Sequence, residues 1–87
     1  MQLEPESLTA VVNRAKRAHG HLGKVITMME EGADCEDVVT QLSAVLKALQ
    51  RTGVVLVTTG MRQCLDAGEQ PDGAGVEQMQ KLFLSLA

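Results

Sequence analysis

The sequence contains almost no aromatic residues, since Phe83 is the only one and tryptophan and tyrosine are absent. Its hydrophobic residues make up 45% of the chain and are mainly valine, leucine, alanine and methionine, which favours helices packed through aliphatic seams. With 87 residues, the chain is one domain at most, and oligomerisation is a common remedy for so small a core. We therefore expect one helical domain over residues 1–87 that assembles with copies of itself.

Cysteine is also scarce, because Cys35 and Cys64 are the only two. Two cysteines are too few for a disulfide scaffold, and no signal peptide precedes them, so we expect a cytoplasmic protein. No apolar run approaches the ~20 residues of a membrane span, and no membrane partner is expected. The sequence shows no glycine-rich phosphate loop, zinc pattern or catalytic triad, so we expect no enzymatic activity.

The longest apolar periodicity lies between residues 34 and 65, which include both cysteines and no proline. Apolar or small residues recur there in steps of four and three, which predicts one long amphipathic helix with Asp34 as its N-cap. The periodic positions are Val38, Leu42, Val45, Leu49, Thr52, Leu56 and Thr59. Gly53 and Gly60 each disfavour the helix by roughly 1 kcal/mol relative to alanine, so packing must stabilise it.

The two cysteines are too far apart on such a helix to react within one chain. They are 29 residues apart in the sequence, which corresponds to about 43 Å along the helix axis. A disulfide requires Cα atoms within about 7 Å. Two helices packed antiparallel about a two-fold near Leu49 and Gln50 would bring Cys35 opposite Cys64 of the partner subunit. An unbroken helix thus predicts two equivalent two-sulfur sites per dimer.

Two further helices are expected around this long one. The first should run from about Ser7 to Glu31, after a flexible arm over residues 1–6, and should end at Gly32. Glycines and a proline in residues 66–75 predict a loop, and the last helix should span residues 76–86. The expected inward face of the first helix comprises Leu8, Val11, Val12, Ala15, Ala18, Leu22, Val25, Ile26 and Met29.

Charge is segregated along the chain, although the net charge is only −3. Residues 13–24 and 38–63 contain basic residues and no acid, whereas the acids gather in residues 30–37 and 66–77. Such segregation can present a basic face on an acidic protein, which favours nucleic acid as a partner. The candidate DNA-binding residues are Arg14, Arg17, Lys24, Lys47 and Arg51.

Several segments resemble the copper-sensitive operon repressor family, which includes copper, nickel/cobalt, formaldehyde and persulfide sensors. They are Asn13-Arg14-x-x-Arg17-x-x-Gly20-His21-Leu22, Met29-Glu30-Glu31, the run from Asp34 to Val45, and a helix that ends with Cys64. The resemblance implies an all-α fold with a three-helix protomer, an antiparallel four-helix dimer core and a dimer-of-dimers tetramer. It also implies a repressor that binds operator DNA and releases it when an effector reaches the cysteines.

One position departs from the copper-sensing members of that family. They place a histidine four residues before the second cysteine, where this chain has Gly60, which offers no side-chain ligand. Two cysteines without that histidine resemble the persulfide-sensing branch. We therefore predict a repressor that senses persulfide or polysulfide and has no metal cofactor. Cys35, at a helix N-terminus, is expected to react first, and Cys64 of the partner subunit to resolve the intermediate.

Two alternatives remain open from the sequence. The same thiolates of Cys35 and Cys64 suit Cu(I) in digonal geometry, which would make the protein a Cu(I)-sensing repressor. A thiol-dependent sulfur carrier or metal-buffering protein without DNA binding is the alternative from another class, and the basic face favours a regulator over it. His19 and His21 are expected to form hydrogen bonds, and the methionines to pack in the core, rather than to bind metal.

Overall fold

The structure, a computed structural model, describes residues 3–66 and 73–86, which form three α-helices and one 3-10 turn and contain no strand. The elements are η1 (Pro5–Leu8), α1 (Thr9–Glu30), α2 (Cys35–Asp66) and α3 (Gly73–Leu86). The predicted all-α class is confirmed for this part of the chain, and α3 begins at Gly73 rather than at Val76. Residues 67–72 of the predicted loop and residues 1–2 of the predicted arm lie outside the described residues.

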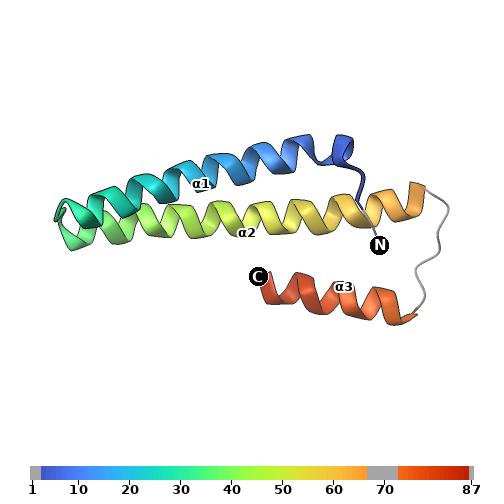
Figure 1. Cartoon of the computed structure of the whole chain (residues 1–87). Helices are drawn as coiled ribbons and strands as arrows, with labels where there is room; N and C mark the ends of the chain where they lie inside the picture. The colour runs from blue at the N-terminus through green and yellow to red at the C-terminus, as the bar shows by residue number, and fades with distance from the viewer. Residues whose placement is uncertain (1–2, 67–72, 87) are drawn as a thin grey trace.

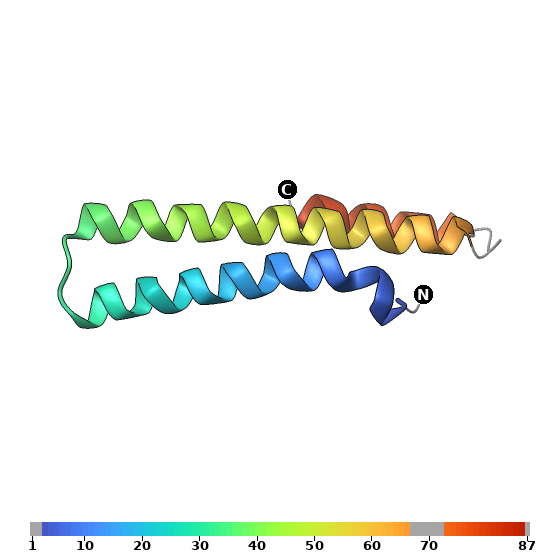
Figure 2. The same cartoon turned by 90° about the horizontal axis from the view of Figure 1, so that it is seen from above.

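The three helices are arranged around α2. Helices α1 and α2 form an antiparallel hairpin, and α3 runs back along the C-terminal half of α2 (Figure 1). Seen from above, α3 lies behind α2 while α1 lies to one side (Figure 2). Within the described residues α1 contacts α2 and η1 but not α3. Helix α2 is therefore the scaffold on which the other two helices pack.

Helix α2 continues without interruption over 32 residues. Neither Gly53 nor Gly60 breaks it. The two cysteines of one chain therefore lie on one continuous helix, as the prediction of sites shared between subunits requires. At a rise of 1.5 Å per residue, Cys35 and Cys64 are about 43 Å apart along its axis. None of the described helices, this one included, is long and apolar enough to cross a membrane.

A glycine turn joins α1 to α2. Gly32 has φ 75°, a region that costs glycine nothing because it has no Cβ. The N–H of Ala33 donates to the carbonyl of Met28 at 3.0 Å, and the N–H of Gly32 donates to the carbonyl of Met29 at 3.2 Å. These two bonds are the Schellman pattern of helix ends. The turn reverses the chain, so that α2 runs antiparallel to α1.

The buried core lies between α1 and α2 and is thin. Its buried hydrophobic residues are Val11, Ala18, Val25 and Val45. The three on α1 are seven residues apart, which keeps them on the face toward α2. By contrast, Val12, Ile26 and Met29 of the predicted inward face are 42%, 44% and 53% exposed. Helix α1 thus has a second apolar face that its own chain does not cover.

Gly53 allows the last turn of α3 to approach α2 closely. A Cβ at this position would lie 2.8 Å from Cδ1 and 2.9 Å from Cδ2 of Leu86. Such contacts are shorter than real Cβ contacts, so a side chain at Gly53 would require Leu86 to move. The glycine that disfavours α2 as a helix therefore favours α2 as a packing surface.

We expect Gly53→Ala to stabilise the protein less than its helix propensity alone would. Alanine favours a helix by about 1 kcal/mol over glycine, but in the wild-type background Leu86 must move to admit the new Cβ. In a Leu86→Ala background the obstacle is gone, and the full gain should appear. Chemical denaturation of wild type, both single variants and the double variant gives the coupling energy. Equal gains in both backgrounds would contradict the packing described.

Candidate effector and DNA-binding sites

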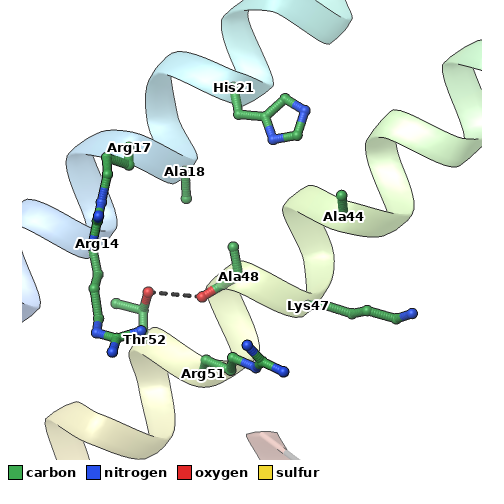
Figure 3. A pocket seen from close by; sticks show the side chains of 9 residues that line it. All are labelled: Arg14, Arg17, Ala18, His21, Ala44, Lys47, Ala48, Arg51 and Thr52. Atoms are coloured by element: carbon green, nitrogen blue, oxygen red, sulfur yellow. Dashed lines mark hydrogen bonds between the residues drawn. The ribbon is translucent and has the colours of Figure 1, made fainter.

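Four of the five predicted DNA-binding residues line one groove between α1 and α2. Arg14 and Arg17 come from α1, and Lys47 and Arg51 come from α2, around a hollow of about 480 Å³. In Figure 3 the long side chain of Arg14 extends toward α2, whereas Lys47 points outward from it. The lining of the groove, all within α1 and α2, includes no acidic residue. Two pairs of basic residues, one pair from each helix, therefore line the same groove.

Small side chains make room for this groove. Ala18 on α1 and Ala44 and Ala48 on α2 also line it, between the basic residues (Figure 3). The hydroxyl of Thr52 donates to the carbonyl of Ala48 at 2.8 Å, so it is satisfied within its own helix. The lining of the groove thus combines four basic side chains with small residues and contains no carboxylate, which suits an anionic partner.

Lys24 lies apart from the other candidates. It lines a separate hollow of about 250 Å³, whose lining includes the carboxylate-bearing Asp37. Lys24 is about 10 Å farther along α1 than Arg17, given the helical rise of 1.5 Å per residue. The groove ends before that point, at His21. The structure thus does not bring Lys24 together with the four groove residues.

A hydrogen bond between the helices closes this end of the groove. Nε2 of His21 lies 2.7 Å from Oε1 of Gln41, and both residues are half-buried. The bond joins α1 to α2, which is the kind of role expected for this histidine. The sequence analysis did not identify Gln41. Its position between the apolar residues Val38 and Leu42 could have indicated a polar contact between helices.

The two cysteines lie at opposite ends of α2. Cys35 is its first residue, and its thiol is free and exposed. Cys64 lies in its last turn, but its side chain lies outside the described residues. Because α2 is unbroken, a bond between the two within one chain is excluded by length. The exposed Cys35 is accessible to a second subunit.

The donor atoms available for a metal ion are few. Among the residues whose side chains are described, no three His, Cys, Asp or Glu residues come together. Gly60 is buried and has no side-chain donor. Cys35 and Cys64 are the only cysteines of the sequence, and the length of α2 means that a pair of their thiolates would come from two subunits. Thiolates are soft ligands that select Cu(I), so Cys35 and Cys64 fit that ion as a two-sulfur set.

The chain matches a known family of regulators over most of its length. The family described as "Metal-sensitive transcriptional repressor" matches residues 7–85. The chain belongs to this family. It is a family of repressors rather than enzymes, which agrees with the prediction of no enzymatic activity. No solved structure matches the chain significantly.

Several curated relatives are similar to this family member. The copper-sensing transcriptional repressor CsoR of Mycobacterium ulcerans (strain Agy99) is 40% identical over 74 residues, which cover 85% of this chain and 62% of that protein. The copper-sensing transcriptional repressor RicR of Mycobacterium tuberculosis (strain H37Rv) is 31% identical over 64 residues, 74% of this chain and 67% of RicR. The uncharacterized protein YrkD of Bacillus subtilis (strain 168) is 37% identical over 62 residues, 67% of this chain and 98% of YrkD. The chain thus spans less than two thirds of the length of CsoR.

One prediction is corrected by these matches. The expectation that the protein has no metal cofactor is wrong, because the family is metal-sensitive and two relatives are named copper-sensing repressors. The physical reason is that Gly60 removes only one nitrogen ligand, and two thiolates alone are already a suitable set for Cu(I). The matches identify the family and not a persulfide-sensing branch within it.

Proposed function

We propose that this protein is a DNA-binding transcriptional repressor that responds to Cu(I) in the cytoplasm. One observation supports this function best: α2 provides both cysteines at its ends and two of the four groove cations, Lys47 and Arg51, at its middle. The groove suits the phosphate backbone of operator DNA, which is recognised mainly through Lys and Arg. A single rigid element thus connects the effector site to the DNA-binding surface.

An uncovered apolar face of the hairpin supports assembly of this repressor with copies of itself. On α2, Val39, Leu46, Leu49 and Leu56 are 58%, 55%, 43% and 37% exposed, in steps of seven, three and seven residues. Such steps are typical of a helix packed against other helices along a continuous seam. An antiparallel dimer through this face, assembled further into a homotetramer, would cover these residues and place Cys35 opposite Cys64 of the partner subunit.

Regulation in this dimer follows from what a link between subunits would do. Cys35 and Cys64 of the partner subunit would hold Cu(I) between them, and the shared ion would link the ends of two α2 helices. A constraint on both ends of α2 shifts Lys47 and Arg51 relative to Arg14 on α1 and relative to the groove of the other subunit. If the link disfavours the DNA-competent shape by roughly 3 kcal/mol, DNA affinity falls about a hundredfold.

A binding assay tests the proposed function directly. The protein is first used to select duplexes from a random DNA pool, and fluorescence anisotropy then measures the affinity for the selected duplex with and without Cu(I), under anaerobic conditions. We expect tight, salt-sensitive binding without Cu(I) and an affinity about a hundredfold lower with it. A sulfur carrier or metal buffer would select no duplex. Unchanged affinity with Cu(I) bound would contradict the proposed effector.

Gly60 favours a second candidate effector, a reactive sulfur species. The Cys35 thiolate would take the outer sulfur of a persulfide donor and release the donor's thiol. The thiolate of Cys64 of the partner subunit would then attack Sγ of Cys35 and displace the outer sulfur as hydrosulfide, which leaves a disulfide between subunits. This chemistry needs two thiols and no third ligand, and a glycine at position 60 is compatible with it.

Under this second candidate, persulfide treatment is expected to produce a covalent dimer. The 32-residue α2 keeps the two cysteines of one chain apart, so only a bond between subunits can form. Non-reducing gel electrophoresis and intact mass spectrometry detect the product, and Cys35→Ala should remove it. A cross-link within a single chain would contradict the continuous helix.

A further inference from the structure

An apolar hollow of about 440 Å³ between α2 and α3 is lined by one methionine from each helix. Met61 of α2 and Met79 of α3 both line it, and both are half-buried. Val57, four residues before Met61, also lines the hollow from α2. Phe83, four residues after Met79, also lines it from α3. Residues four apart share one helix face, so the two helices direct these pairs toward each other. The lining includes no charged residue.

The hollow lies close to one of the two proposed effector cysteines. Cys64 follows Met61 by three residues on the continuous α2, and positions three apart are neighbours along the surface of a helix. Gly60, which leaves the expected donor position empty of a side chain, directly precedes Met61. Met61 is therefore the methionine nearest along α2 to both Gly60 and Cys64.

We propose that Met61 and Met79 supply thioether ligands to Cu(I) bound by Cys64 and by Cys35 of the partner subunit, an inference that rests on the proposed function. A thioether is uncharged and soft, and it binds Cu(I) in preference to hard cations. No His, Cys, Asp or Glu cluster of the described residues offers a third ligand. Two methionines from two helices thus take the place of the histidine that Gly60 does not provide.

Conservative substitutions of the two methionines test this proposal. Leucine has nearly the volume of methionine and no sulfur, so Met61→Leu and Met79→Leu should preserve the fold. Competition with a chromophoric Cu(I) chelator measures the affinity, and copper X-ray absorption reports the number of sulfur ligands. We expect an affinity loss of at least roughly 10-fold for Met61→Leu, the size that outer-shell groups already reach. The double variant should lose more affinity and show fewer sulfur neighbours.

A matched variant in the same hollow separates the sulfur from its packing. Phe83→Leu alters the lining without removing sulfur, and it should leave the Cu(I) affinity and the absorption spectrum unchanged. If the double methionine variant binds Cu(I) with wild-type affinity and sulfur count, the proposal is overturned while the proposed function stands. If wild type itself does not bind Cu(I), both are overturned. An equal loss from Phe83→Leu would also overturn the proposal, because packing would then explain the effect.

Discussion

Joint replacement of Arg14 and Arg51 by alanine is expected to lower DNA affinity by on the order of a hundredfold at low salt. The two side chains lie on opposite walls of the groove. In an oligomer every subunit would lose both positive charges. Both are exposed, so helix content by circular dichroism and oligomer size by light scattering should not change. Each lost phosphate contact should also reduce the salt dependence of binding, by about one in the slope of log affinity against log salt.

Lys81→Ala is the control for that prediction, because it removes the same charge from a different surface. Lys81 is exposed on α3, which lies on α2 away from α1 (Figure 1). It does not line the groove. We expect its effect on DNA affinity to be small, and that of Lys24→Ala to be smaller than that of Arg51→Ala. Comparable losses for Lys81→Ala and Arg51→Ala would show that the groove is not the DNA-binding surface.

Replacement of Cys35 by alanine is expected to abolish Cu(I)-driven release while DNA binding persists. The cysteine lies at the start of α2, far along the helix from Lys47 and Arg51, so the groove itself is untouched. The roughly hundredfold effect of Cu(I) on DNA affinity should fall to about one. Cys64→Ala should give the same result, because each site needs both sulfurs.

Glu36→Gln is the control, since it changes an exposed neighbour of Cys35 and leaves both thiols intact. Its response to Cu(I), measured by the same anisotropy titration, should match wild type. If one cysteine variant lost Cu(I)-driven release of DNA while the other kept it, the paired site would be contradicted. Only one thiol would then be essential.

The sequence was sufficient to predict the long helix and the distance between its ends. Regular apolar spacing from Val38 to Thr59, about six helical turns, outweighs two glycines, and the structure confirms that α2 is unbroken. Spacing alone did not show which apolar residues face which partner. Helix α1 has two apolar faces, so Val11 is buried by its own chain while Val12, one residue later, is 42% exposed.

Contacts between elements were harder to predict, because they depend on how the helices are aligned along their axes. The glycine turn at Gly32 sets the alignment that places His21 beside Gln41 and ends the groove before Lys24. The contact between Gly53 and Leu86 depends on how far α3 extends back along α2. No local pattern in the sequence determines how far α1 or α3 is shifted along α2.

Copper capacity in a mixture of cysteine variants tests most directly whether each site is shared between two subunits. A Cys35→Ala chain and a Cys64→Ala chain are coexpressed and purified together, and bound Cu(I) per chain is compared with wild type. Each variant alone should lack the paired site. With free exchange, half of the dimers are mixed and regain one of two sites, so the mixture should reach about one quarter of the wild-type capacity. Capacity in the mixture no greater than in either variant alone would contradict the shared site.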